Sequence, residues 1–447
     1  MDELNILELI QQKRYVEVKK ILSEMNEVDI AEILEDEDLD IATILIIFRM
    51  LPKDFAVEVF AHFSSEQQLD LVNAMTDKEL KYIVDELFFD DMIDLLEEMP
   101  ANIVSKILAQ SSSEERKLIN QFLKYPPDSA GSLMTIEYVE LKKNMTVREA
   151  MVHIKETGLT KETVYTCYVT NVNRKLEGII SLRLLVVSNE DAKIEDLMED
   201  EIIYVNTHDD QETVANTFRR YGFLALPVVD KENRLTGIIT VDDIMDVMEQ
   251  EATEDFQIMA AMSPSDDPYL SSSVITLSKK RISWLLILMV TATISGRIIS
   301  SYEELLSSAV ILASFMPMLM NTGGSSGSQA STLIIRGLAT GEIEMGDILV
   351  VLWKEFRVSV VVGIALALVN FLRLMYITKA GFNVSLTVSL TLIVTIVIAK
   401  LVGSVAPIAA KKFKLDPAIM AAPLITTVVD AVALVVYFSI ASLLMGV

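Results

Sequence analysis

The chain has few of the residues from which most enzyme active sites are built. Only one of its 447 residues is cysteine and three are histidine. The histidines, His62, His153 and His208, are scattered, and the sequence contains no His/Cys metal cluster, P-loop or nucleophile elbow. These absences argue against an enzyme.

The scarcity of cysteine also bears on the cellular compartment. Because Cys167 stands alone, no disulfide can form within the chain, as is usual in a reducing cytosol. The first residues, Met1-Asp-Glu-Leu-Asn, lack the basic and apolar regions of a signal peptide. We therefore expect no secretory signal and a cytosolic environment for this cysteine.

Positive charge is scarce in the first part of the chain. Residues 1–278 contain 25 Lys and Arg against 56 Asp and Glu, a net charge of −31, whereas residues 279–447 contain 13 against 8, a net +5. An acidic body of this kind disfavours nucleic acid and anionic lipid as partners and favours cations. Composition alone also fits an acidic protein that is kept soluble by its charge.

The second part of the chain has the pattern of a membrane body, with long apolar runs separated by short charged breaks. Each run offers about 20 largely apolar residues, the length that a bilayer core requires. We expect a short surface helix over residues 345–355, between the second and third runs. The five predicted spans cover residues 282–302, 305–323, 356–377, 384–406 and 420–445.

The basic residues around these spans predict their orientation. With the N-terminus inside, nine Lys and Arg residues fall on the inner side and three on the outer side. We therefore predict a multi-pass plasma-membrane protein with a cytoplasmic N-terminus and an external C-terminus. The inner residues are Lys279, Lys280, Arg281, Arg336, Lys354, Arg357, Lys411, Lys412 and Lys414, and the outer ones are Arg297, Arg373 and Lys379.

Asp430 is the only charged residue in the last 30 residues, 418–447. A carboxylate inside a span persists when it faces a partner or a water-filled path. Thr426 and Thr427 precede it by four and three residues and share its helical face. Carboxylate and hydroxyl oxygens suit a hard cation. We favour a cation path over the alternative, a buried Asp that bonds to a neighbouring helix.

The second predicted span ends in a segment of small and polar residues, 321–332, that begins with Asn321. Small residues let helices approach closely, and hydroxyls and amides bond across helices, so packing and pore lining are both open here. Pro317 and Gly323-Gly324 could open the helix and expose carbonyls, and Pro423 could do so in the fifth span.

The acidic part begins with a region that the periodicity predicts to be all-helical. Apolar residues recur at three- and four-residue spacing, for example over 80–96, and prolines punctuate short helices. Short helices in series predict a small superhelical domain over residues 1–125. Pro126-Pro127 ends it.

A weak internal repeat follows, with modules at 126–190 and 191–255. Each module has the order strand, helix, strand, strand, helix, and each closes on Gly-Ile-Ile, at 178–180 and at 237–239. The pair resembles tandem cystathionine-β-synthase (CBS) modules, which commonly bind adenine nucleotides. In that family a Thr or Ser followed three residues later by Asp often holds the ribose, so Thr240 and Asp243 are candidates for binding ATP. The first module has Leu184 in place of that Asp.

Acidic clusters recur on the predicted elements. Seven of the fourteen residues in 242–255 are acidic and none is basic. Like charges one helical turn apart repel unless a counter-ion is bound. A solvated acidic face is the usual explanation, but similar clusters at 90–94 and 209–212 favour divalent-cation sites that join domains.

The whole order, an acidic helical domain, a CBS pair and five spans, resembles the MgtE family of bacterial magnesium channels. The specific parts are residues 423–430, 321–332, 415–417 and 251–255. The resemblance implies a multidomain fold, with an all-α superhelical domain, an α/β CBS pair and a helical membrane domain. It also implies a homodimer whose second and fifth spans line one pore, with Asp430 facing hydrated Mg²⁺.

The resemblance further implies a plug helix over about 256–278, in a connecting segment 256–280 before the membrane domain at 281–447. Cytosolic Mg²⁺ would hold this plug against the pore. Two positions depart from the family, because Gly222 stands where a ligand Asp can occur and Ser325 stands where Asn is usual. The regulatory ligands implied by motif position are Glu58, Asp90, Asp94, Asp210, Glu212, Asp243, Asp246, Glu251, Glu254 and Asp255.

The sequence therefore predicts a Mg²⁺ channel that is closed by cytosolic Mg²⁺. One alternative is a path for another divalent cation, such as Mn²⁺ or Co²⁺. Another is a non-conducting membrane sensor whose CBS pair binds nucleotide or Mg²⁺. Asp430 argues against the sensor, which needs no carboxylate inside the membrane.

Overall fold

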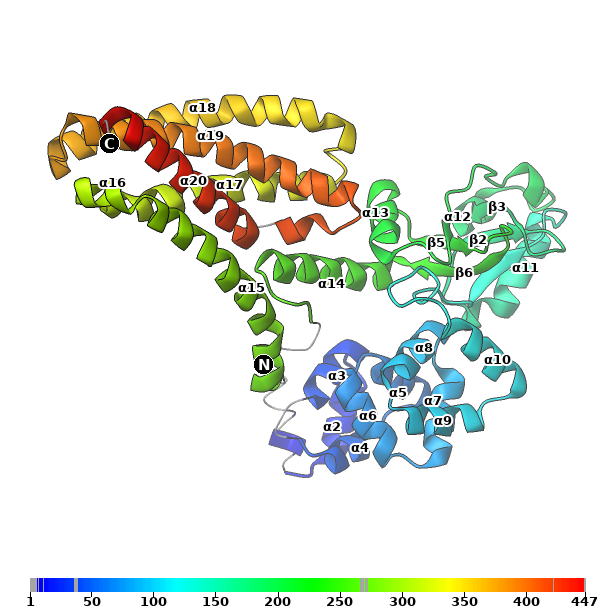
Figure 1. The fold of residues 1–447 in the computed structure, drawn as a ribbon. Helices are drawn as coiled ribbons and strands as arrows, with labels where there is room; N and C mark the ends of the chain where they lie inside the picture. Colours follow the sequence, from blue (N-terminus) through cyan, green and yellow to red (C-terminus); the bar gives the residue numbers. More distant parts are fainter. Residues whose placement is uncertain are drawn as a thin grey trace. The chain divides into compact units, whose positions relative to one another are not determined.

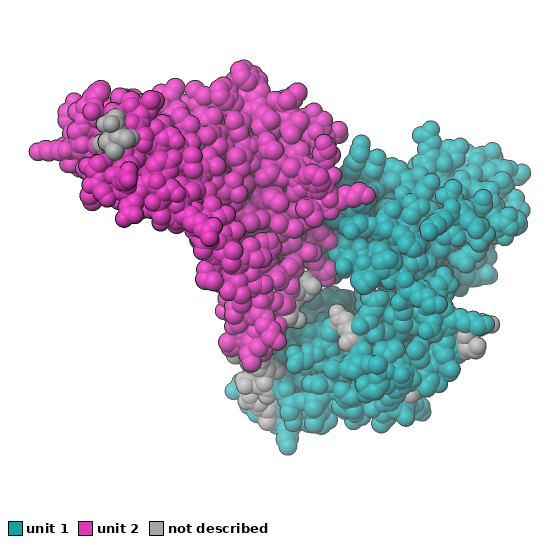
Figure 2. All heavy atoms as spheres, viewed as in Figure 1, with its two compact units in different colours: residues 1–248 teal, residues 249–447 magenta. Residues whose placement is uncertain are grey.

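The structure is a computed structural model of the full chain, and it forms two compact units, residues 1–248 and residues 249–447 (Figure 2). Each unit has hydrophobic clusters of its own. The structure describes residues 6, 8–10, 12–35, 39–265, 269, 272–420 and 422–445.

The N-terminal region is all-helical, as predicted. Its helices are short because turn residues and caps recur; Thr76 and Glu79, for example, form a capping box at the start of α7. Helices α3 to α7 each contact the helix two places further along, which is the packing of a superhelical array (Figure 1). The helices are α2 (Tyr15–Leu22), α3 (Glu27–Leu34), α4 (Ile41–Phe48), α5 (Lys53–Ala61), α6 (Ser65–Ala74), α7 (Asp77–Glu86), α8 (Phe89–Glu98), α9 (Ala101–Gln110) and α10 (Ser113–Phe122).

The repeat predicted from the sequence folds into two small mixed sheets, which confirms a CBS-like pair. In each sheet the first strand pairs parallel with the second, and the second pairs antiparallel with the third. The first module has β1 (Tyr138–Leu141), α11 (Val147–Thr157), β2 (Thr163–Thr170), β3 (Leu176–Ser181) and α12 (Leu182–Val187). The second has β4 (Val205–Asn206), α13 (Gln211–Tyr221), β5 (Ala225–Val229), β6 (Leu235–Thr240) and α14 (Val241–Met259).

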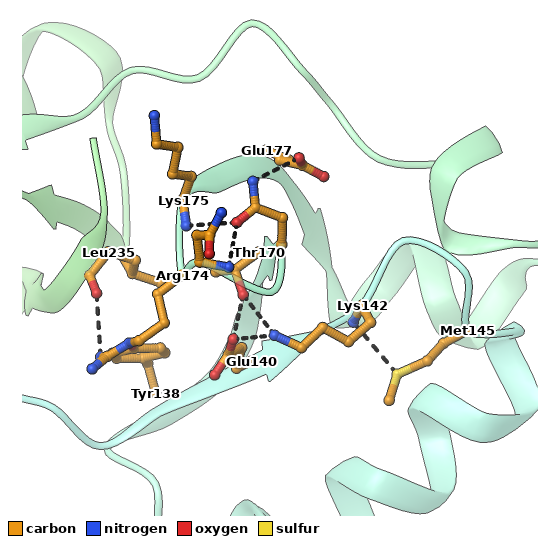
Figure 3. Close-up of polar contacts among 11 residues, drawn as sticks. Tyr138, Glu140, Lys142, Met145, Thr170, Arg174, Lys175, Glu177 and Leu235 are labelled. Atoms are coloured by element: carbon orange, nitrogen blue, oxygen red, sulfur yellow. Dashed lines mark hydrogen bonds and ion pairs between the residues drawn. The ribbon is translucent and has the colours of Figure 1, made fainter. Parts of the chain in front are cut away.

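The two modules are joined through their hairpin turns. The Leu235 amide donates to the Arg174 carbonyl at 2.9 Å, and the Leu176 amide donates to the Asn233 carbonyl at 3.2 Å. The Arg174 guanidinium also donates to the Tyr138 hydroxyl at 3.0 Å and to the Leu235 carbonyl at 3.3 Å (Figure 3). Arg174 and Asn233 have φ of 61° and 59°, so the turns of the two modules share one conformation.

The helical domain and the second CBS module share one hydrophobic core. Phe218 of α13 and Ile239 of β6 belong to the same cluster as Phe89 of α8 and Phe122 of α10. Packing therefore continues across the boundary that Pro126-Pro127 marks in the sequence, and it brings the acidic first turns of α8 and α14 into the same compact unit.

The helix predicted over residues 256–278 is not formed as one element. Helix α14 continues from the CBS pair to Met259, and the next helix, α15 (Val274–Ser301), runs on into the first predicted span. Between them the chain turns, and the Gln257 side chain bonds both the amide and the carbonyl of Ser265, at 2.8 and 2.9 Å. The family resemblance implied a plug role for this predicted helix. Its described residues belong instead to α14, to α15 and to the segment between them.

Among the described residues, four helices are long and apolar enough to cross a membrane, over Val274–Ser301, Met345–Thr378, Phe382–Lys412 and Pro417–Leu444. The predicted surface helix at 345–355 is wrong, since most of it belongs to the long α18. The helices of this unit are α15, α16 (Glu303–Ser308), α17 (Met316–Ala339), α18 (Ile348–Leu372), α19 (Phe382–Lys412) and α20 (Ala422–Met445), with a π-helical turn at Arg373–Thr378.

Helix α17 is the element that differs most from the predicted second span. The segment before it forms α16 and a 3₁₀ turn at Val310–Phe315, so the helix begins at Met316 rather than at 305. Its 24 residues would reach about 36 Å, enough to cross a bilayer, but its small polar residues make it less apolar than the other four. It packs against α19 and α20 (Figure 1).

The glycines of α17 serve close packing and do not open the helix. The helix is continuous through Gly323, Gly324 and Gly327. A Cβ at Gly323 would lie 2.7 Å from Thr395, and one at Gly403 of α19 would lie 2.2 Å from the Gly327 carbonyl oxygen. Pro423 likewise causes no break, because it lies in the first turn of α20, where its missing N–H is not needed.

We expect Gly403→Ala to lower the thermal stability of the detergent-solubilised protein by several degrees. The added methyl would meet the rigid backbone of α17, and overpacking of this kind typically costs about 1–3 kcal/mol. Gly296→Ala is the matched control, since no described atom outside its own helix lies within 4 Å of a Cβ there. Equal melting temperatures for the two variants would contradict the close packing of α17 on α19.

Candidate cation path and acidic cluster

A cavity of about 1190 Å³ lies between the packed helices of the membrane unit. Its walls come mainly from the small-residue face of α17 and from α20, with one residue of α19. The lining residues are Pro317, Met320, Asn321, Gly324, Ser325, Ser328, Gln329, Thr332, Leu333, Lys400, Thr426 and Asp430. Three of the four predicted pore residues, Asn321, Thr426 and Asp430, are thus brought to one wall.

The small residues of α17 explain how polar groups reach this wall. Because Gly323 and Gly327 pack against α19 and α20, the other face of α17 lines the cavity, with the side chains of Asn321, Ser325, Ser328 and Gln329. Ser325 lines the cavity and places a hydroxyl there. Amide, hydroxyl and carboxylate oxygens can hydrogen-bond the water shell of a hydrated divalent cation.

The two threonines before Asp430 do not have the same role. Both hydroxyls donate to the Pro423 carbonyl, Thr426 at 3.0 Å and Thr427 at 2.9 Å. Thr426 lines the cavity with Asp430, whereas Thr427 is not among the described lining residues. The threonine that shares the cavity wall with Asp430 is therefore the one four positions earlier, Thr426, and not the one three positions earlier, Thr427.

The sequence analysis missed Lys400, which also lines the cavity. Its Nζ lies 3.7 Å from the Glu355 carboxylate of α18, and both residues are buried. Lys400 lies inside the predicted fourth span, 384–406, and was assigned to neither side of the membrane. The signal was available, because a lysine inside a span is as costly as Asp430.

The second candidate site is a cluster of carboxylates in the first compact unit, residues 1–248. Asp90 and Asp91 lie in the first turn of α8, Asp243 in the first turn of α14, and Glu162 directly before β2. Burial, together with the charges of its neighbours, raises the pKa of Glu162 to about 7 and the pKa values of Asp91 and Asp243 to about 6. Burial and the charge of Asp243 also raise the pKa of Asp90 well above its ordinary value.

Two oxygens in this cluster are buried without a hydrogen-bond partner in the described structure, Oδ1 of Asp90 and Oε2 of Glu162. Orphaned carboxylate oxygens beside other carboxylates suit a divalent cation, which would supply the missing positive charge. The predicted residues Asp90 and Asp243 are therefore brought together. The sequence analysis missed Glu162 and Glu137, whose charge also acts on Glu162 and Asp91.

The cluster is not a closed metal cage. Within the described ranges no three His, Cys, Asp or Glu side chains surround one point at ligand distance. Thr240 donates its hydroxyl to Asp243 at 2.6 Å and is 4% exposed, so the predicted ribose-binding pair is bonded to itself. A ribose would have to replace this bond.

The other predicted ligands are spread over several elements. Glu58 and Asp94 lie on exposed faces of α5 and α8, Asp210 caps α13 by accepting from the Glu212 amide at 3.0 Å, and Asp246 follows Asp243 on α14. Glu251, Glu254 and Asp255 lie on the later turns of α14, beyond the first compact unit. Gly222 has φ of 67° and ends α13 in the left-handed conformation, which explains a glycine at this position.

The protein combines a membrane helix bundle, whose cavity is lined by the Asp430 carboxylate, with an acidic body that contains a CBS pair. This combination defines a cation transporter rather than an enzyme. Family models match residues 316–440 (MgtE, divalent cation transporter), 25–128 (MgtE intracellular N domain) and 194–250 (CBS domain). The chain belongs to the MgtE family of magnesium transporters.

Relatives support this over nearly the whole chain. The chain is 34% identical over 405 residues to the magnesium transporter MgtE of Thermus thermophilus, covering 90% of this chain and 89% of the relative. It is 33% identical over 439 residues to that of Bacillus subtilis, covering 98% and 96%. A solved cytosolic domain of the Mg²⁺ channel MgtE in complex with ATP matches 55% of this chain and 99% of its own, with 32% identity and a TM-score of 0.52.

Proposed function

We propose that this protein carries Mg²⁺ across the plasma membrane through the cavity between α17, α19 and α20. The observation that supports this most directly is Asp430 on one wall with Asn321, Ser325 and Thr426. Mg²⁺ gives up its water reluctantly, so a wide cavity with one carboxylate and several hydroxyl and amide groups suits the hydrated ion. The relatives' printed names, magnesium transporters, support the same substrate.

The working protein would be a homodimer, with the acidic body in the cytoplasm and the C-terminus outside. The family model for residues 25–128 describes an intracellular domain, which agrees with the predicted orientation. The test is Mg²⁺ uptake into proteoliposomes that contain the purified protein. Uptake no faster than in protein-free vesicles would contradict the proposal, and faster uptake of Mn²⁺ or Co²⁺ would favour the alternative cargo.

We further propose that cytosolic Mg²⁺ closes the path by binding to the acidic body. Carboxylates that repel one another at Asp90, Asp243 and Glu162 would be held together by a bound divalent cation. Several such sites act jointly, because each adds RT ln(1 + [L]/Kd) to the closed state. If each site contributes ~1 kcal/mol to the closed state, five or six sites together reach the ~5.5 kcal/mol that moves a two-state equilibrium from 1:99 to 99:1.

The raised pKa values predict how the metal-free cytoplasmic body responds to pH. Unfolded carboxylates titrate near pH 4, whereas Asp91 and Asp243 do so at about 6 and Glu162 at about 7 in the folded protein. The folded state therefore binds more protons in this window, and stability falls as pH rises from about 4 to about 7.

For residues 1–260 in chelator we expect the melting temperature to be lower at pH 7.5 than at pH 5.5 by on the order of 5 °C, and millimolar Mg²⁺ should remove most of the difference. Differential scanning calorimetry would measure both effects. A higher melting temperature at pH 7.5 in chelator would contradict the buried cluster.

ATP is proposed as a second ligand of the CBS pair, since the cytosolic domain of a relative was solved with it. If Thr240 and Asp243 hold the ribose, Thr240→Val should weaken ATP binding to a 130–255 fragment by about tenfold, a loss of ~1.4 kcal/mol. Calorimetry at millimolar ATP would measure it. No heat with the unaltered fragment would dispose of this site.

A further inference from the structure

Lys400 is a buried cation inside a helix long enough to cross the membrane. It is 5% exposed, and its counter-charge Glu355, on the neighbouring α18, is 9% exposed. Ionisable residues at such depth persist when they are paired or face a water-filled path. Lys400 meets both conditions, because it is paired with Glu355 and lines the cavity that contains Asp430.

The pairing is loose, which leaves the ammonium directed at the cavity. The distance from Nζ to the Glu355 Oε2 atom is 3.7 Å, longer than a hydrogen bond, and this oxygen has no hydrogen-bond partner in the described structure. An ammonium has three donors, and Lys400 is one of the residues that line the cavity, whereas Glu355 is not among the described lining residues. Glu355 therefore acts as a charge behind Lys400, and the positive end of the pair faces the cavity.

Lys400 and Asp430 lie at different levels along the cavity. A Cβ at Gly327 would lie 3.1 Å from the carbonyl oxygen of Ala399, the neighbour of Lys400. A Cβ at Gly323 would lie 2.9 Å from Val429, the neighbour of Asp430. Val429 also lies 3.4 Å from a Cβ at Gly327, so the offset is less than one helical turn, and it places Lys400 towards the end where α20 begins. In the proposed orientation this is the cytoplasmic end.

We propose that Lys400 determines how tightly the cavity holds a divalent cation, with Glu355 as the residue that positions it. The inference rests on the proposed function. The ammonium repels an ion at Asp430 in proportion to the ion's charge, twice as strongly for a divalent as for a monovalent cation. Conduction requires binding that is weak enough for release. Lys400 thus opposes Asp430 and lets the ion leave towards the cytoplasm.

The test compares two variants that should shift the electrostatic potential at Asp430 in opposite directions. Glu355→Gln leaves the ammonium without its counter-charge, and the double variant Lys400→Gln/Glu355→Gln removes both charges. In proteoliposomes of full-length protein, we expect Glu355→Gln to raise the Mg²⁺ concentration for half-maximal uptake about tenfold and the double variant to lower it severalfold, with a lower maximal rate. Lys412→Gln makes the same change outside the cavity, at the end of α19, and should match the unaltered protein.

Opposite shifts separate this role from a merely structural one, which would move both variants the same way. The variants are compared only if their gel-filtration profiles match that of the unaltered protein and the unaltered protein carries Mg²⁺. Under these conditions, half-saturation that shifts in the same direction in both variants, or in neither, would overturn the inference. If Glu355→Gln does not fold, the double variant decides, because unchanged or weaker half-saturation there also overturns it. Failure of the unaltered protein to carry Mg²⁺ would overturn the proposed function, and this inference with it.

Discussion

Replacing Asp430 with alanine is expected to abolish selective Mg²⁺ uptake while leaving the protein folded. Asp430 is the one carboxylate among the described residues that line the cavity, and Lys400 lies on the same wall. Without Asp430 the cavity would present only a positive end to an entering cation. We expect uptake to fall by at least about a hundredfold, since losing ~3 kcal/mol of favourable interaction changes an equilibrium by that factor.

Asp430→Asn separates charge from shape at the same position. The amide keeps the size of the carboxylate and can hydrogen-bond water, but it cannot attract a cation at long range. We expect this variant to lose most uptake as well. Glu342→Gln is the control, because it removes an exposed carboxylate of the same unit that is not among the described residues lining the cavity.

Proteoliposome uptake with a fluorescent Mg²⁺ indicator would measure these effects, and gel filtration would show that the variants fold. Uptake at the unaltered rate in a well-folded Asp430→Ala protein would remove Asp430 from the path. Loss of uptake in Asp430→Ala together with full activity of Asp430→Asn would show that the side chain matters through its hydrogen bonds rather than its charge.

Neutralising the acidic cluster is expected to uncouple the cytoplasmic body from Mg²⁺. In Asp90→Asn/Glu162→Gln the two orphaned oxygens belong to neutral amides, so repulsion is relieved without a cation. We expect two opposite effects: greater stability in chelator, and loss of protection by Mg²⁺. The Mg²⁺ concentration for half-maximal protease protection of the cytoplasmic body should rise about tenfold, and the channel should stay open at Mg²⁺ levels that close the unaltered protein.

The control is Glu24→Gln/Asp70→Asn, which removes two exposed carboxylates from the helical domain that contains Asp90. It makes the net charge less negative by the same amount and should leave the protection curve in place. Monovalent salt should not replace Mg²⁺, because screening weakens repulsion without bridging. Closure of the cluster variant at the same Mg²⁺ concentration as the unaltered protein would show that this cluster is not the sensor.

The same comparison tests the ligands that the family resemblance implies on α14. Neutralising Asp246, Glu251 and Asp255 together should shift the curve in the same direction, since these residues follow Asp243 along one helix. If the protease-protection curve is unchanged in this triple variant but shifted in Asp90→Asn/Glu162→Gln, Mg²⁺ sensing depends on the buried cluster and not on the three α14 residues.

Local patterns predicted the elements well where propensity and burial agree. The capping residues and prolines of the first 125 residues predict short helices, and the paired Gly-Ile-Ile strands predict the two modules. Sequence patterns were less informative in the membrane unit, where packing between helices decides what a glycine does. The sequence left open whether the glycines of α17 open the helix or serve close packing, and the structure shows packing, because Gly403 and Gly327 meet at backbone distance.

The sequence by itself determined the class of the protein, because a strongly acidic body, long apolar runs and a lone Asp430 each follow from the order of residues along the chain. It could not show that Asp90 and Glu162 are buried neighbours or that Lys400 faces Asp430's cavity, since these residues are 72 and 30 positions apart in the chain. Only packing of α8 on the CBS pair, and of α17 on α19 and α20, sets those distances. Burial then decides the chemistry, because a charge that water would screen on the surface acts at full strength in a low-dielectric site.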